Sequence, residues 1–230
     1  MLLKAIQMKL SSTNEDRIPM IVSAATAMIL LISVLLVPAV GYSPTTQGDH
    51  TDWSTVADRL IEAEDWQGLL DLSVRWTQHE PENATAWFDA GMAYGNLERY
   101  REAAEAYRKG VELSPDSSSG WYDLGNSYGL TDRYDDAIAA YVEAIRLDPD
   151  NLDALINLGH AYIQVDRYDK AIQIFHRARS IDPASARVWN NLAIAYFLAG
   201  NKAEALHAVL ELKRLDPTQA EKVQRVINAH

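Results

Sequence analysis

The chain has 230 residues, of which 48% are hydrophobic, with only 11 glycines and 8 prolines, a composition that excludes a disordered or fibrous protein. The formal net charge of -11 at pH 7 argues against a nucleic-acid partner, because binding to phosphates depends on clustered Lys and Arg. Cysteine is absent, which excludes disulfides, thiolate metal sites and a cysteine nucleophile.

The first predicted element is a membrane span. Residues 18–40 form an uncharged run of 23 residues, IPMIVSAATAMILLISVLLVPAV. At about 1.5 Å per residue, such a helix crosses a hydrocarbon core of roughly 30 Å. Lys4, Lys9 and Arg17 precede the run, whereas the first charged residues after it are acidic. The positively charged flank of a membrane span stays on the cytoplasmic side. We therefore expect residues 1–17 to be cytoplasmic and the residues after the span to lie outside the cytoplasm, on the periplasmic side in a bacterium with two membranes.

A cleaved signal peptide is the alternative for the same run, because the small residues Ala39 and Gly41 lie just before a candidate cut site between Gly41 and Tyr42. Two features favour a retained signal anchor. The segment before the run contains Glu15 and Asp16, and the run exceeds the roughly 7 to 15 residues of a signal core. Residues 41–49, rich in Gly, Ser, Thr and Pro, are predicted to be a short linker.

From residue 50 onward the sequence repeats every 34 residues. The fourth position holds Trp53, Trp87, Trp121, Leu155 and Trp189, and the last motif position holds Pro81, Pro115, Pro149, Pro183 and Pro217. The five units are 50–83, 84–117, 118–151, 152–185 and 186–219, and the first is degenerate. Residues 220–230 are predicted to form one amphipathic capping helix.

Two apolar stripes at helical spacing predict two helices within each unit. In 118–151 they are Trp121, Leu124, Gly125 and Tyr128, then Ala137, Tyr141, Ala144, Ile145 and Leu147. Pro149 ends the second helix, because proline lacks an N–H and restricts the residue before it. The aromatic residues of these stripes are therefore predicted to be core.

This pattern resembles the tetratricopeptide repeat family, whose units read W-x2-L-G-x2-Y and then A, F, A and P at fixed offsets. The resemblance implies an all-α fold, a right-handed superhelical solenoid of helix-turn-helix repeats, here preceded by one transmembrane helix. It also implies that Gly125 faces Ala137, and that the first helix of each pair lines a concave groove.

No pattern in the sequence indicates an enzyme. None of the six histidines forms an i,i+3 or i,i+4 pair with another, so a helix-borne metal site is not expected. The sequence also lacks G-x-S-x-G, Walker and H-E-x-x-H motifs. We predict no catalytic residues, no cofactor and no metal.

Opposite the buried stripe, the first helices present mixed polar and apolar residues. The family's carboxylate clamps use Lys and Arg where Phe88, Tyr122 and Ile156 stand, so such a clamp is not expected. Family members with a ladder of Asn hold an extended peptide, and Asn157 and Asn191 lie one repeat apart, with Asp89 and Asp123 in the same row. Apolar pockets are predicted at Phe88, Tyr122, Ile156, Ile163 and Phe197.

The predicted partner-binding residues are Phe88, Asp89, Met92, Tyr122, Asp123, Asn126, Ile156, Asn157, His160, Arg187, Asn190 and Asn191. The alternative is that they are ordinary solvated residues.

We therefore expect a non-catalytic, membrane-tethered scaffold that binds a protein or an extended peptide in the groove and helps assemble an exported or envelope complex. The alternative is a chaperone-like module of a maturation pathway such as cytochrome c assembly, which presents a substrate protein to an enzyme. An enzyme that uses repeats for recognition is disfavoured, because these segments leave no room for a catalytic domain. The degenerate first unit is compatible with a homo-oligomer.

Overall fold

The computed structural model describes residues 52–229, which form eleven α-helices and no strand. The helices are α2 (Trp53–Glu62), α3 (Trp66–His79), α4 (Ala84–Asn96), α5 (Tyr100–Leu113), α6 (Ser118–Leu130), α7 (Tyr134–Leu147), α8 (Leu152–Gln164), α9 (Tyr168–Ile181), α10 (Ala186–Leu198), α11 (Lys202–Leu215) and α12 (Pro217–Asn228). The predicted cytoplasmic segment, membrane span and linker lie outside the described residues. Within 52–229, no helix combines the length and hydropathy that crossing a bilayer requires.

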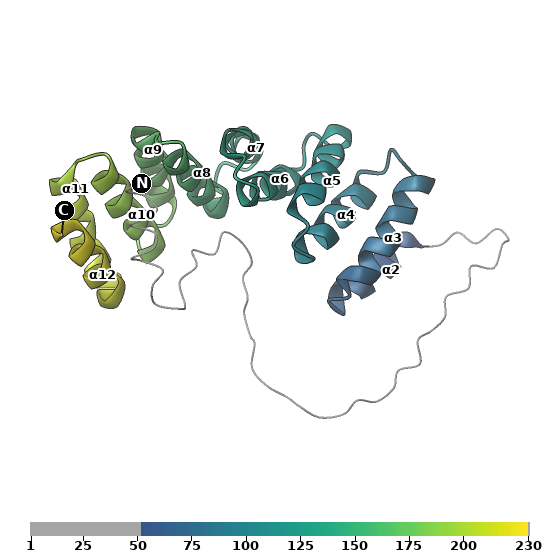
Figure 1. The fold of residues 1–230 in the computed structure, drawn as a ribbon, viewed down its shortest axis with the longest axis horizontal. Coiled ribbons are helices and arrows are strands. Elements are labelled where there is room, and N and C mark those ends of the chain that lie inside the picture. The colour runs from purple at the N-terminus through teal and green to yellow at the C-terminus, as the bar shows by residue number, and fades with distance from the viewer. Residues whose placement is uncertain (1–51, 230) are drawn as a thin grey trace, which may run out of the picture.

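The helices are paired as predicted, and the pairs stack in chain order into a curved array (Figure 1). The first helix of each later unit contacts its own second helix and the second helix of the preceding unit. In Figure 1, α5, α7 and α9 follow the outer side of the curve, whereas α4, α6, α8 and α10 follow the inner side. We call the surface of these first helices that lies inside the curve the inner face.

The turn inside each helix pair contains one residue in the left-handed backbone conformation. Positive φ angles recur every 34 residues, at Glu64, Glu98, Asp132, Asp166 and Gly200. In the second unit, the N–H of Arg99 donates to the carbonyl of Tyr94 at 2.8 Å, and Glu98 N–H donates to Gly95 at 3.0 Å. This is the Schellman pattern that satisfies the last carbonyls of a helix. Glycine adopts this conformation without the steric cost that other residues incur.

The tryptophan of the repeat also fixes the turn between units. Its indole N–H donates to the carbonyl of the preceding proline in Trp87–Pro81 at 2.9 Å, Trp121–Pro115 at 3.0 Å and Trp189–Pro183 at 2.9 Å. Leu155 has no such donor. In that unit Arg177 Nη2 donates to the Pro149 carbonyl at 2.6 Å instead. The same carbonyl is thus held by a different side chain.

Small and large residues are matched between the two helices of a pair. A side chain on Gly125 would meet the Tyr141 ring at 2.6 Å, so the nearest neighbour of this glycine is Tyr141 and not the predicted Ala137. Gly91 and Gly159 likewise lie against Tyr107 and Phe175. The fifth unit carries Ala193 and Val209 at these two positions, both buried. Where alanine replaces the glycine, the smaller valine therefore replaces the aromatic residue that faces it.

The capping helix begins three residues earlier than predicted, at Pro217 instead of residue 220. Asp216 caps it by accepting a hydrogen bond from Gln219 N–H at 2.9 Å. Proline fits the first helical position because its missing N–H is not needed there. Val223 and Ile227 are buried against the preceding units, which closes this end of the core.

Candidate protein-binding face

The predicted partner-binding residues lie on four consecutive first helices. They are Phe88, Asp89 and Met92 in α4, Tyr122, Asp123 and Asn126 in α6, Ile156, Asn157 and His160 in α8, and Arg187, Asn190 and Asn191 in α10. The sixth residue of each of these units forms a row that we call the polar row: Asp89, Asp123, Asn157 and Asn191. Asp123 is half-buried and the other three are buried.

The middle of the polar row is closed by hydrogen bonds between units. Tyr141 O–H donates to Asn126 Oδ1 at 2.7 Å, and Asn157 Nδ2 donates to the same oxygen at 3.0 Å. Asn157 Nδ2 also lies 3.4 Å from the Tyr122 hydroxyl. This network joins α6, α7 and α8. Asn126 and Asn157 therefore hold neighbouring repeats together.

One unit earlier, the equivalent positions stay open. Met92 replaces Asn126, and Tyr107 replaces Tyr141. The side chains of Asp89, Asp123 and Tyr107 form no hydrogen bond or ion pair with any residue in 52–229. The network is absent because the Met92 thioether is a poor acceptor for the Tyr107 hydroxyl, and the Asp123 carboxylate, which stands in place of the Asn157 amide, has no donor when it is ionised.

Burial changes the acidity of this open group. It raises the pKa of Asp89 to about 6, and the nearby charge of Asp58 acts in the same direction. It also raises the pKa of Asp123 to about 6. The pKa of Tyr107 is raised by burial first, and then by the charges of Asp123 and Asp89. Both carboxylates therefore lie close enough to act on the same hydroxyl.

The C-terminal part of the inner face is largely paired. Arg187 of α10 forms an ion pair with Asp153 of α8, one repeat apart. Gln219 Nε2 of α12 donates to Asn190 Oδ1 at 3.2 Å. Asn191 differs, because its Nδ2 is buried without a hydrogen-bond partner among the described residues.

His160 is half-buried beside this part of the face. Its ring meets Phe175 edge-on, with 5.8 Å between the ring centroids. Burial lowers its pKa, a hydrogen bond with Asn191 acts against that shift, and the Arg187 charge adds to it. The neutral ring is therefore favoured.

The structure corrects the prediction of apolar pockets at two positions. Ile156 is 1% exposed and Ile163 is 7% exposed, so neither presents a surface to a partner. The Phe88 ring packs over Gly110 and Gly120, where a side chain on either glycine would clash with it. The two isoleucines are buried, and Phe88 is half-buried, because neighbouring units cover part of the first helix that an isolated helical wheel shows as free.

Two tyrosines of the second helices were missed as contributors to this face. Tyr107 and Tyr141 were predicted only as core residues, yet their hydroxyls lie at the polar row. A signal was present in the sequence. A tyrosine hydroxyl buried in a core requires a polar partner, and Asn126 stands where the preceding unit has Met92.

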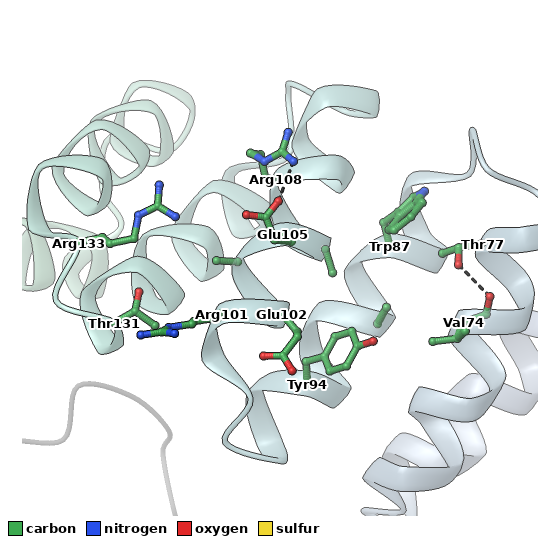
Figure 2. Close-up of a pocket in the computed structure, with 13 residues that line it drawn as sticks. Val74, Thr77, Trp87, Tyr94, Arg101, Glu102, Glu105, Arg108, Thr131 and Arg133 are labelled. Carbon is green, nitrogen blue, oxygen red and sulfur yellow. Dashed lines mark hydrogen bonds and ion pairs between the residues drawn. The ribbon is translucent and has the colours of Figure 1, made fainter.

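A hollow of about 980 Å³ lies among α3, α4, α5 and the turn after α6, away from the polar row (Figure 2). Trp87 and Tyr94 of the repeat pattern contribute to it, together with charged residues of α5. Arg108 lies at its rim and forms an ion pair with Glu105 at 2.7 Å (Figure 2). The sequence pattern gave no indication of this hollow, and none of the predicted partner-binding residues lines it.

Comparison with known protein families also identifies repeats in this part of the chain. Two family models described as tetratricopeptide repeat match the chain, one at residues 131–175 and 164–228 and the other at 63–118 and 88–151. A search of the curated proteins found no match to this chain.

Among solved structures, the MamA protein is 25% identical with a TM-score of 0.68, and the match covers 74% of this chain and 92% of that one. MamA from Desulfovibrio magneticus RS-1, residues 41 to the end, is 20% identical with a TM-score of 0.67, covering 73% of this chain and 94% of that one.

YrrB, described as a TPR protein with an unusual peptide-binding site, is 20% identical with a TM-score of 0.71, and the match covers 77% of this chain and 92% of that one. At such identities the second MamA structure and YrrB establish the fold alone. The family matches together span residues 63–228, which contain the helices from α3 to α12, and the chain therefore belongs to the tetratricopeptide repeat family.

Proposed function

We propose that this protein is a membrane-tethered scaffold whose inner face binds an extended segment of a partner protein. The observation that carries this proposal is the polar row, in which the Asn191 Nδ2 donor is buried without a partner among the described residues and the buried residue Asp89 receives no hydrogen bond from any of them. Buried polar groups in native proteins are normally paired. A bound backbone would supply the missing acceptors and donors at regular intervals.

The shape and the family support the same reading. The row runs along successive first helices on the inner side of the curve, so an extended chain can contact several units at once (Figure 1). YrrB, which has a similar fold, is described as having a peptide-binding site. The closed network at Asn126 and Asn157 divides the face into an acidic part over α4 and α6 and a paired part over α8 and α10.

The test is site-specific crosslinking in intact cells. A photoreactive phenylalanine derivative replaces Tyr122, which is half-buried on the inner face. The matched control replaces Val142, an exposed residue of α7 in the same unit. We expect a discrete protein adduct from position 122 and none from 142. Equal labelling from both positions would show that the inner face is not the binding surface.

We also propose that residues 18–40 anchor the protein in the membrane and place the repeats outside the cytoplasm, where they would help assemble an exported or envelope complex. The length of the uncharged run and the positive charges before it support this. A reporter that is active only outside the cytoplasm, fused after His230, should work in the full-length protein. Activity of a cytoplasmic reporter in the same place would reverse the orientation.

A cleaved signal peptide makes a different prediction for the same fusion. The reporter would again be active, but the mature protein would begin after Gly41 and would leave the membrane fraction. Mass spectrometry of the purified chain separates the two cases, because an anchored protein retains residues 18–40.

A further inference from the structure

We propose that the inner face over α4 and α6 binds a basic side chain, Lys or Arg, of the partner segment through Asp89 and Asp123. The inference rests on the proposed function and specifies the chemistry of the partner. It assigns to this region a preference that the family resemblance does not supply.

The first step is the difference between two equivalent sites one repeat apart. Asn157 has an amide donor that Asn126 accepts, and the site closes on itself. Asp123 is the residue equivalent to Asn157. An ionised carboxylate accepts hydrogen bonds but donates none, and this holds for both Asp123 and Asp89. No described residue donates to either carboxylate. In the open site, therefore, neither carboxylate accepts a hydrogen bond.

The second step is charge. Asp58 adds a third negative charge near Asp89, and no described Lys or Arg forms an ion pair with any of the three. Two partly desolvated carboxylates without a cation are unfavourable at neutral pH. A neutral donor would satisfy one oxygen but leave the charge. An ammonium or guanidinium group supplies donors and opposite charge together.

The third step is access. Among the described residues, Asn191 Nδ2 is the only wholly buried polar side-chain atom without a partner. The oxygens of Asp89 and Asp123 therefore keep contact with solvent, although the side chains around them are packed. The Tyr107 hydroxyl lies in reach of both charges. A long basic side chain can enter such a site by burying its methylene stem while its charged end meets the carboxylates.

A metal ion fits the same place less well. Within residues 52–229, no group of three or more His, Cys, Asp or Glu side chains is arranged to hold a metal ion. The basic preference should also be confined to the N-terminal part of the inner face. Farther along, Asp153 already has Arg187 as its cation.

The experiment selects binders from a phage library of random 12-residue peptides on the immobilised full-length protein in detergent. The selection is run in parallel on the Asp89→Asn/Asp123→Asn double variant and on Asp169→Asn, which changes an exposed carboxylate of α9. We expect peptides from the unaltered protein to share one Lys or Arg position. Their affinity should fall about tenfold or more with the double variant or with norleucine at that position, and stay unchanged with Asp169→Asn.

The outcomes separate this inference from the proposed function. Peptides that bind without a shared basic residue, and that lose affinity when Tyr122 is replaced by Ala, would overturn the inference and leave inner-face binding intact. Failure to recover any peptide, or peptides insensitive to every inner-face substitution, would overturn both. Thermal unfolding of each variant checks that the fold is kept, and the near-isosteric change to Asn favours that.

Discussion

Asn157 of α8 and Asn126 of α6 are joined across neighbouring repeats by a 3.0 Å hydrogen bond, from Nδ2 of the first to Oδ1 of the second. The same oxygen accepts from Tyr141, so one buried amide links three helices. This arrangement makes Asn126 a stability residue, even though it lies on the face predicted to bind a partner.

Replacing Asn126 by Ala should destabilise the array by about 2 to 4 kcal/mol, because it leaves the Tyr141 hydroxyl and the Asn157 amide buried without their acceptor. Urea denaturation followed by circular dichroism measures the change. Asn96→Ala is the matched control, since that amide is exposed and bonds only to the Met92 carbonyl of its own helix. A similar effect from both substitutions would contradict the role assigned to the network.

Two glycines with empty surroundings should respond in opposite directions to alanine. A side chain on Gly95 or on Gly200 would meet no neighbouring atom within 4 Å, but Gly200 has φ at +81° whereas Gly95 lies in helix α4. Gly95→Ala should stabilise by about 0.5 to 1 kcal/mol through helix propensity. Gly200→Ala should destabilise by about 1 kcal/mol, because alanine is strained in the left-handed region.

The midpoint of chemical denaturation tests both substitutions in one series. Each variant serves as the control of the other, because neither creates a contact. If Gly200→Ala were as stabilising as Gly95→Ala, the positive φ in this turn would be wrong.

The match between small and large residues predicts a coupled pair. Gly159→Ala should destabilise by about 1 to 3 kcal/mol, because the added carbon would overlap the Phe175 ring. In a Phe175→Val background the same change should have a much smaller effect, since Ala193 and Val209 occupy these positions in the next unit. A double-mutant cycle measures the coupling. Additive effects would contradict direct packing between the two positions.

The 34-residue period predicted much of this fold because each unit is a local structure. Apolar spacing defined the helix pairs, and Pro149 and its equivalents predicted where second helices end. Contacts between units were harder to predict. The burial of Ile156 and the placement of Phe88 depend on which residues the neighbouring unit brings close, and a helical wheel carries no such information.

The candidate site was predictable in position but not in chemistry. Asp89, Asp123, Asn157 and Asn191 were expected to share a row, and their spacing placed them there. Whether a polar residue of the first helix forms a hydrogen bond depends on the second helix of the pair. Tyr141 donates to Asn126, whereas Tyr107 has only Met92 at the equivalent position. Single-position reasoning could not separate these two cases.

The open carboxylates predict a characteristic dependence of stability on pH. Burial raises the pKa of Asp89 and of Asp123 to about 6, above the value of about 3.9 expected for an unfolded chain. Their stabilising contribution is therefore full below pH 4 and lost as pH rises through 6. Asp89→Asn/Asp123→Asn should match the unaltered protein near pH 4 and exceed its stability at pH 7 by about 2 kcal/mol or more.

Denaturation at both pH values measures this difference, with Asp169→Asn as the exposed control. A double variant that is less stable than the unaltered protein at pH 7 would mean that these carboxylates have a stabilising partner, and it would remove the reason to expect a basic ligand there.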